Sequence, residues 1–390
     1  MSGFKKRLYY FWKKTSERQS RKKLGKTFFK GAIARFEACT TKKPAAQMRA
    51  EMKALQQHWN CFPYQYYRFD FYRTDCPASL EEMKQYVPVF FLHYLFFPIS
   101  YKDYGILCED KLLTYASLAA FDVPQPNMLF CFDNHQFYDT HNNLIAADDV
   151  DALIQASTSK KLFIKPRFGS EGKDIFIFNK NNDNRFADKE QTIFNHNFFL
   201  NDTRIRATSG RDATGFYVIQ EGLVQHEEVN QIYAGAINTF RVITECIQGE
   251  AQLLFALLRM GRGGNQVDNA SSGGVYTKID PVSGALGDVA IAHDRAAFEA
   301  HPDTGFQFKG ATIKAWQNVK ALALEAAIKF REIRHVGWDI ALTPDGPVII
   351  EINKRPDMDM IQDFYGGIQH HLKIDSREWW YQSDYTIKNL

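Results

Sequence analysis

The sequence of 390 residues predicts a mixed fold of helices and strands, in which the strands follow one another in pairs joined by short turns. Apolar stretches separated by turn residues predict such pairs over residues 161–178, 236–260 and 336–353. Helical spacing of apolar residues predicts a helix that begins near Asp110 and another over residues 313–333. The last strand pair carries the strongest indication of function, because it contains two acids at strand positions.

The number of residues in the turn of this hairpin decides whether its two acids face each other. Pro344-Asp345-Gly346 has turn chemistry, and a three-residue loop with glycine in the left-handed position is a common hairpin connection. Such a loop pairs Thr343 with Pro347 and sets Asp339 directly opposite Glu351. A loop of two or four residues would send the two acids to opposite faces, because side chains alternate along a strand.

Two facing carboxylates repel each other, and a divalent cation removes that penalty. Asn353 adds an amide oxygen on the same face as Glu351. Oxygen ligands without His or Cys favour a hard ion, Mg²⁺ or alternatively Mn²⁺, completed by water and phosphate. The alternative is an edge hairpin with solvated acids, although Glu351 lies within an apolar run where a solvated acid is unfavourable.

The composition is that of a globular protein with two or three domains, rich in aromatics with 32 Phe and 18 Tyr. No apolar run approaches the roughly 20 residues of a membrane span, and the N-terminus has no apolar signal core. The six cysteines show no CxxC spacing, which argues for a reducing compartment and against a structural zinc site. We therefore expect a cytoplasmic protein.

The net charge of +3 conceals a basic N-terminal segment. Residues 1–60 carry 16 Lys/Arg and three acids, a net charge of +13, which leaves −10 on the rest. Within residues 1–35, aromatic and apolar residues recur at helical spacing among clusters of Lys and Arg. This pattern predicts a basic amphipathic helix, either packed on the protein with a solvated face or bound to an anionic surface such as the inner membrane face. Nucleic acid is not expected, because no nucleic-acid motif accompanies the charge.

Two lysines occupy unusual positions in the first half of the chain. Lys111 lies in the first turn of the predicted helix, where a cation opposes the helix dipole. Lys165 ends the apolar strand 161–165, and a cation in that setting favours an anionic partner. The glycine-containing loop that follows, residues 169–173, exposes backbone N–H groups that can cover phosphates.

Further along, residues 215–224 form a strand that breaks at Gly222. The connector after it is either a simple turn or a place where adenine binds to the backbone. Arg241 and Arg259 each lie within an apolar strand, so each needs an acidic partner from protein or phosphate. Residues 261–274 are rich in glycine and polar residues and predict a mobile loop.

These features, in this order, resemble the ATP-grasp superfamily, and in particular its sugar-transfer-associated branch, which is related to the alpha-L-glutamate ligases. The resemblance covers about residues 105–370. The motifs that carry it are Lys111, Lys165 with Gly169-Ser-Glu-Gly172, Gln220-Glu221, Gln225-His226, Asn238-Thr-x-Arg241, Arg259, Asp268-Asn269 with Gly273-Gly274, Gly337-Trp-Asp339, and Glu351-x-Asn353.

The resemblance implies an α+β ATP-grasp fold with two lobes that clasp ATP, here with a basic helical N-terminal extension. It also implies a role for each site residue. The ATP-binding residues would be Lys111, Lys165, the loop residues Gly169, Ser170, Glu171, Gly172 and Lys173, the adenine-binding Gln220, Glu221 and Leu223, and Glu228 at the ribose. Asp339, Glu351 and Asn353 would bind Mg²⁺. Arg241, Arg259 and Asn269 would be catalytic and steady the phosphoryl group and the acyl-phosphate.

The predicted organisation has five parts. They are the basic extension 1–60, an aromatic-rich segment 61–105, the N-terminal lobe 106–224, the C-terminal lobe with the metal site 225–375, and a tail 376–390. The predicted activity is ATP-dependent ligation of a carboxylate to an amine through an acyl-phosphate, with a sugar acid, amino sugar or amino acid as substrate in surface polysaccharide biosynthesis. A kinase and a non-catalytic ATP-binding module are the alternatives.

Overall fold

The computed structural model describes residues 29–133, 136–169, 174–201, 215–266, 268 and 273–374. The chain divides into two compact units, the first formed by residues 1–100 and 357–390 and the second by residues 101–356. Most of the predicted basic helix in residues 1–35 lies outside the described residues. The boundaries predicted between lobes remain predictions. The one at residues 224–225 falls between strand β7 (Phe216–Glu221) and helix α12 (Glu227–Asn230).

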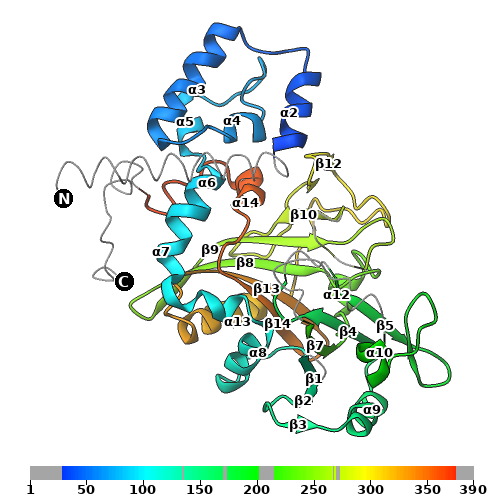
Figure 1. Cartoon of the computed structure of the whole chain (residues 1–390). Coiled ribbons are helices and arrows are strands. Elements are labelled where there is room, and N and C mark those ends of the chain that lie inside the picture. Colours follow the sequence, from blue (N-terminus) through cyan, green and yellow to red (C-terminus); the bar gives the residue numbers. More distant parts are fainter. Residues whose placement is uncertain are drawn as a thin grey trace. The chain divides into compact units, whose positions relative to one another are not determined.

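Within its described residues, the second unit contains two seven-stranded sheets whose pairings are all antiparallel (Figure 1). The first sheet has, in spatial order, β3 (Leu144–Ile145), β2 (Gln136–Tyr138), β1 (Met128–Asp133), β7 (Phe216–Glu221), β4 (Lys161–Pro166), β5 (Phe176–Lys180) and β6 (Phe186–Ala187). The second has β12 (Ala297–Phe298), β11 (Ala290–Ala292), β10 (Val275–Lys278), β9 (Glu250–Met260), β8 (Thr239–Ile247), β13 (His335–Thr343) and β14 (Gly346–Asn353).

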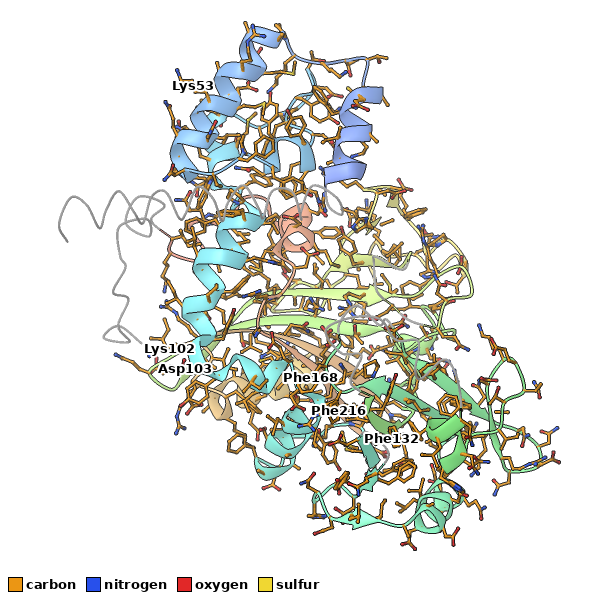
Figure 2. The ribbon with its side chains drawn as sticks, in the orientation of Figure 1. Lys53, Lys102, Asp103, Phe132, Phe168 and Phe216 are labelled. Carbon is orange, nitrogen blue, oxygen red and sulfur yellow. The ribbon has the colours of Figure 1, made fainter. Side chains whose placement is uncertain are left out.

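An aromatic core holds the first sheet against helices α9 (Ala147–Ala156) and α10 (His196–Asn201). Phe132, labelled in Figure 2, stacks on Phe199 with ring centroids 4.6 Å apart. Strand β4 sends every second side chain into this core, namely Leu162 and Ile164. Because side chains alternate along a strand, Phe163 and Lys165 must point to the opposite face, which is the face that lines the site described below.

Helix α13 (Trp316–Lys329) packs on one face of the second sheet and confirms the helix predicted over residues 313–333. Trp316 contacts Phe240 of β8, with ring centroids 6.3 Å apart. On the same face Trp338 donates from its indole nitrogen to the Thr244 hydroxyl at 2.8 Å. Alternation then places the odd-numbered residues of β8 and β13 on the other face.

The turn between β13 and β14, the hairpin that carries the predicted metal ligands, is shorter than predicted. Thr343 pairs with Gly346, so the loop contains two residues, Pro344 and Asp345, instead of three. Gly346 has φ +125°, a conformation that only glycine adopts readily. The prediction of a three-residue loop that pairs Thr343 with Pro347 is therefore wrong.

A β-bulge nevertheless restores the predicted pairing of the acids. The register shifts between Asp339 and Ile340, because Ile340 pairs with Ile349 whereas Asp339 pairs with Glu351. Ile350 is thus the extra residue that a bulge inserts into one strand. A two-residue loop followed by one bulge residue places Asp339 directly opposite Glu351, as a three-residue loop without a bulge would.

The first unit is helical in its described residues. Its helices are α2 (Phe29–Ala38), α3 (Ala45–Trp59), α4 (Gln65–Arg68), α5 (Leu80–Gln85), α6 (Val89–Phe91), the π-helix η1 (Leu92–Phe96), α7 (Phe97–Tyr101), which leads into the second unit, and α14 (Met358–Tyr365). Arg68 forms a bidentate ion pair with Asp363, at 3.0 and 2.6 Å, which joins α4 to α14. Among the residues that the structure describes, no helix is long and apolar enough to span a bilayer.

Candidate functional site

A cavity in the second unit is lined by residues of both sheets and of helix α8 (Lys111–Ala120). The residues predicted from the sequence that line it are Lys111, Lys165, Gly169, Gln220, Glu221, Leu223, Arg259, Asp339 and Glu351. These residues are spread over 240 positions of the chain, and the fold brings them to one site. Arg241, Asn353 and Glu228 do not line the cavity.

Lys165 lies near the end of β4 and faces the cavity. Its amino group donates a hydrogen bond to the side-chain oxygen of Gln220 on β7, at 2.8 Å. Burial, together with the nearby charge of Lys111, lowers the pKa of Lys165 to about 8, although Glu351 acts in the opposite direction. The site therefore holds a cation at a cost in hydration, which an anionic ligand would offset.

Lys111 is the first residue of α8, as predicted, and its amino group donates to the carbonyl oxygen of Gly169 at 2.8 Å. This contact joins the helix to the start of the glycine-containing loop. Ser170, Glu171, Gly172 and Lys173 lie outside the described residues, so their predicted contacts with phosphate remain predictions.

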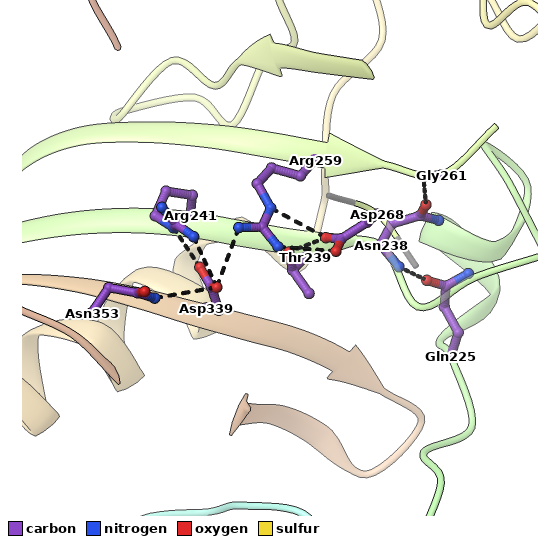
Figure 3. A network of polar contacts seen from close by, with 9 residues as sticks. All are labelled: Gln225, Asn238, Thr239, Arg241, Arg259, Gly261, Asp268, Asp339 and Asn353. Atoms are coloured by element: carbon purple, nitrogen blue, oxygen red, sulfur yellow. Dashed lines mark hydrogen bonds and ion pairs between the residues drawn. The ribbon is translucent and has the colours of Figure 1, made fainter. Parts of the chain in front are cut away.

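Asp339 is at the centre of a network of buried polar contacts (Figure 3). Arg241 binds it through two nitrogens, at 2.5 and 2.9 Å, and Arg259 reaches it at 3.3 Å. The amide of Asn353 donates to the same carboxylate at 3.3 Å. Asp339 is 3% exposed, so these contacts compensate a charge that is almost fully removed from water.

A second acid completes the pairing of Arg259. Asp268 accepts from the Nε and Nη2 atoms of Arg259 at 3.3 and 2.9 Å, and also from the hydroxyl of Thr239. Asp268 and Thr239 both line the cavity. The prediction that the two strand arginines need acidic partners is thus met by protein carboxylates.

Asp339 and Glu351 face each other across the hairpin, yet their environments differ. Burial acts to raise the pKa of Asp339, but Arg241 and Arg259 outweigh it and hold that pKa below its usual value. Burial and the charge of Asp339 raise the pKa of Glu351, against the effect of Lys111 and the two arginines. Within the described residues, the carboxylate of Glu351 accepts no hydrogen bond and forms no ion pair.

The donor set fits a divalent metal ion that also binds phosphate. Glu351 offers both carboxylate oxygens, and Asn353 offers its amide oxygen, since only its nitrogen is used by Asp339. Asp339 would have to exchange a contact with arginine for a contact with the metal. No cluster of three His, Cys, Asp or Glu side chains suited to a metal occurs in the described part of the chain. Mg²⁺ sites on nucleotides need no such cluster, because phosphate and water supply the remaining ligands.

The connector after β7 offers the backbone N–H of Leu223 to a ligand in the cavity. Glu221 donates its N–H to the carbonyl of Asn127 at 2.9 Å, and Gly222 donates to that of Lys161 at 2.8 Å. The N–H of Leu223, which lines the cavity, has no partner in the described residues. The carboxylate of Glu221 is occupied as well, because the Asn127 amide and the Ser157 hydroxyl donate to it.

Glu228 lies elsewhere. Its two carboxylate oxygens accept from the backbone N–H groups of Lys314 and Ala315, where helix α13 begins. A carboxylate at a helix N-terminus satisfies unpaired N–H groups and the dipole. In the structure Glu228 therefore caps this helix, and its predicted contact with a ribose remains a prediction. Asn269 lies outside the described residues.

Several residues of the cavity were not predicted. They are Cys108, Thr114, Tyr115, Leu118, Gln125, Pro126, Phe163, Pro166, Ile175, Ile237 and Gln266, with Ile350 and Ile352 of β14. Phe163 could have been found, because it is two residues before Lys165 on the same face of the strand. Gln125 is held by its contact with the Tyr115 carbonyl at 2.8 Å, for which the sequence contains no local signal.

Three solved structures that resemble this chain differ strongly from it in sequence. Biotin carboxylase from Campylobacter jejuni is 10% identical, with 70% of this chain and 46% of that chain covered and a TM-score of 0.42. D-alanyl-alanine synthetase A from Vibrio cholerae O1 is 13% identical, with 71% and 64% covered and a TM-score of 0.40. D-alanine–D-alanine ligase from Bacillus anthracis is 11% identical, with 71% and 69% covered and a TM-score of 0.37. This chain thus matches less than two thirds of the length of the biotin carboxylase and of the D-alanyl-alanine synthetase.

Comparison with curated protein sequences gives no match. A model of the family described as sugar-transfer associated ATP-grasp matches residues 99–373, which is more than half of the chain. This match and the two antiparallel sheets confirm the predicted α+β ATP-grasp fold. The chain belongs to the family of sugar-transfer associated ATP-grasp proteins.

Proposed function

We propose that this protein is an ATP-dependent carboxylate–amine ligase that forms an amide through an acyl-phosphate. The observation that carries the proposal is one cavity lined by two lysines, a buried arginine and a carboxylate without a partner among the described residues. These residues are Lys111, Lys165, Arg259 and Glu351. Cations suit a polyphosphate, and the carboxylate suits its metal ion.

In this proposal, the amino groups of Lys111 and Lys165 contact the phosphates of ATP, and the loop at residues 169–173 covers them. Adenine binds along residues 220–223, where Leu223 offers its free N–H. Mg²⁺, or alternatively Mn²⁺, is held by Glu351, Asn353 and Asp339. The metal supplies positive charge that neutralises the phosphate oxygens.

The reaction has two steps. A carboxylate oxygen of the first substrate attacks the γ-phosphorus of ATP, so that the bond to ADP breaks and an acyl-phosphate forms. The nitrogen of the amine substrate then attacks the acyl carbon, phosphate leaves, and the amide forms with loss of a proton. Arg259 and Asn269 stabilise the negative charge of the acyl-phosphate and the tetrahedral adduct. Arg241 contributes mainly by orienting Asp339, to which it binds through two nitrogens.

A ligase fits the cavity better than a kinase does. A kinase positions a base near the hydroxyl that accepts the phosphoryl group. Asp268 is the described acid closest to this role, but Arg259 and Thr239 already occupy its carboxylate. His226 caps helix α12 (Glu227–Asn230), and His335 pairs with Glu245 at 3.3 Å, so neither histidine serves the cavity.

The substrates and the cellular location are proposed on narrower grounds. The description of the family supports a sugar acid or amino sugar of a surface polysaccharide as one substrate. The absence of CxxC spacing supports a cytoplasmic protein, and the basic segment at residues 1–35 supports contact with the inner membrane face.

The first test is binding of Mg-ATP to the full chain. Nucleotide at 100 times its Kd should raise the free energy of unfolding by about 2.7 kcal/mol. Glu351→Gln should lose the dependence of this effect on Mg²⁺, whereas Glu250→Gln, an exposed acid on β9, should retain it. No stabilisation of the wild type at such excess would refute the proposal.

The second test separates ligase from kinase. The protein is incubated with Mg-ATP and pooled sugar acids and amino acids, with hydroxylamine in place of the amine. We expect release of ADP and formation of a hydroxamate, because hydroxylamine attacks an acyl-phosphate. A stable phosphorylated product without hydroxamate would instead establish a kinase.

A further inference from the structure

Two charged residues beside the cavity have no role in the proposal above. Asp110 and Arg167, 57 positions apart, form a bidentate ion pair in which Nε contacts Oδ1 at 2.8 Å and Nη2 contacts Oδ2 at 2.7 Å. Asp110 is 2% exposed, whereas Arg167 is partly exposed. Planar bidentate pairs of this kind fix orientation as well as distance.

The pair joins the two segments that carry the phosphate-binding groups. Asp110 is the N-cap of α8, and its Oδ1 accepts from the N–H groups of Leu112 and Leu113 at 3.0 and 3.3 Å. Arg167 follows β4 directly and precedes the loop at residues 169–173. Backbone contacts join the same segments, because the Lys111 N–H donates to the Arg167 carbonyl at 3.0 Å.

The consequence is a defined place for Lys111. This lysine stands at the first position of α8, where the helix dipole opposes a cation. Asp110 offsets that effect with an adjacent negative charge, and the amino group of Lys111 reaches back to Gly169 at 2.8 Å. Lys111 and Gly169, at the start of the loop, therefore keep a fixed relative position only while α8 and the end of β4 are held together.

We propose that Asp110 and Arg167 are positioning residues that hold Lys111 and the start of the 169–173 loop in place for the phosphates of ATP, and so set the affinity for Mg-ATP. The inference rests on the proposed binding of ATP. It assigns neither residue a contact with the nucleotide.

A direct electrostatic effect predicts a different result, which makes the inference testable. If charge alone mattered, removal of the negative Asp110 near the phosphates would strengthen ATP binding, and removal of Arg167 would weaken it. If the pair acts by positioning, both removals weaken binding. Asp110→Asn is the informative variant, because asparagine is also a favourable N-cap and retains the cap of α8.

The experiment measures the Kd of Mg-ATP by calorimetry for the full-length wild type, Asp110→Asn, Arg167→Met, Arg167→Lys and the double variant Asp110→Asn/Arg167→Met. We expect each single removal to raise Kd about tenfold, since displacement of a contact by about 1 Å can cost up to about a hundredfold. The Kd of the double variant should be no higher than that of either single variant, because each substitution removes the same ion pair. Arg167→Lys should fall between wild type and Arg167→Met, since lysine keeps the charge but not the bidentate geometry.

Arg334→Met is the matched control. Arg334, which directly precedes β13, contacts Glu245 of β8 at 2.9 and 2.6 Å in a partly buried ion pair, and neither residue lines the cavity. Its loss should lower Tm without a change in Kd. Tighter binding by Asp110→Asn, or multiplied effects in the double variant, would overturn the inference. Failure of the wild type to bind Mg-ATP would instead refute the proposed function itself.

Discussion

The charged residues that line the cavity differ from one another in how fully other protein groups compensate their charge. Asp339 accepts hydrogen bonds from two arginines and an amide, whereas Glu351 accepts none within the described residues. Lys165 donates only to a neutral amide oxygen in its described contacts. The uncompensated charges, Glu351 and Lys165, are therefore the ones that gain most from a metal and a phosphate.

The lowered pKa of Lys165 predicts how nucleotide binding depends on pH. Burial and Lys111 lower this pKa to about 8, so the free protein loses the proton as the pH rises through that value. ATP favours the protonated amine, so binding takes up a proton above about pH 8. Kd should therefore rise with pH, by at most about tenfold per pH unit. Lys165→Arg should abolish this dependence, because arginine stays charged.

The same shift in the pKa of Lys165 affects folding in the opposite direction: with rising pH, ATP binding weakens while the contribution of this residue to stability grows. Unfolded Lys165 binds its proton more tightly than the folded form does, so its contribution to the free energy of unfolding rises between about pH 8 and about pH 10.5. Weaker binding in this window would thus not reflect a loss of stability at this residue. Calorimetric titrations from about pH 7 to about pH 9.5 test the prediction, and equal Kd values across that range would contradict it.

The residue types of the site could be predicted, but their partners could not. A cation in an apolar strand needs an acceptor, which identified Lys165, Arg241 and Arg259 from the sequence alone. Whether the acceptor is a protein carboxylate or a ligand depends on which strands become neighbours. Asp339 lies 98 positions after Arg241, and only the pairing of β13 with β8 brings them together.

At the scale of elements, the β13–β14 hairpin shows how two local features, the loop length and a bulge, together set which residues pair. Its sequence identifies both strands and the turn, but a loop of two residues and a loop of three fit the Pro-Asp-Gly stretch equally well. The bulge has no local signal, because Ile350 is one of several apolar residues in the strand. The register is fixed by the packing of both faces, which a pattern along one strand does not contain.

The bulge predicts a specific effect of a deletion. Removal of Ile350 leaves a regular hairpin with a two-residue loop, in which Ile349 pairs with Ile340 and Glu351 still pairs with Asp339. We expect this variant to retain Mg²⁺-dependent binding of ATP, because the two acids stay on one face. Ile350→Ala keeps the chain length and should retain that dependence, although the side chain lines the cavity. Thermal shift with and without Mg²⁺ measures both, and loss of Mg²⁺-dependent stabilisation in the deletion variant alone would show that the pairing of the two acids does not suffice without the bulge.

At the scale of the whole molecule, the sequence indicates a function for the second unit, residues 101–356, but not for the first unit. The motifs of the site lie in residues 101–356, whereas the predicted segments 1–60 and 61–105 contain no motif with known chemistry. The structure also indicates the residue at which the basic segment can be removed without damage to the packed part of the first unit. Ala32 in α2 is buried against Tyr64 and Val89, and Arg35 donates to the Arg68 carbonyl at 3.2 Å. A truncation through residue 35 would therefore damage the first unit.

The truncation that tests the membrane prediction ends before Phe29, where α2 begins. Residues 1–28 carry ten Lys/Arg and one acid, a net charge of +9. We expect the full chain to bind vesicles that contain anionic lipid, and a chain lacking residues 1–28 to bind much more weakly, since each basic residue near such a surface contributes about 1 kcal/mol. Binding should fall as salt is raised from about 0.05 M to about 0.5 M, because the Debye length shortens. Co-sedimentation with anionic and with neutral vesicles measures this, with Mg-ATP stabilisation as the control that the truncated chain is folded. Equal binding of both chains to anionic vesicles would show that the basic segment does not bind the membrane.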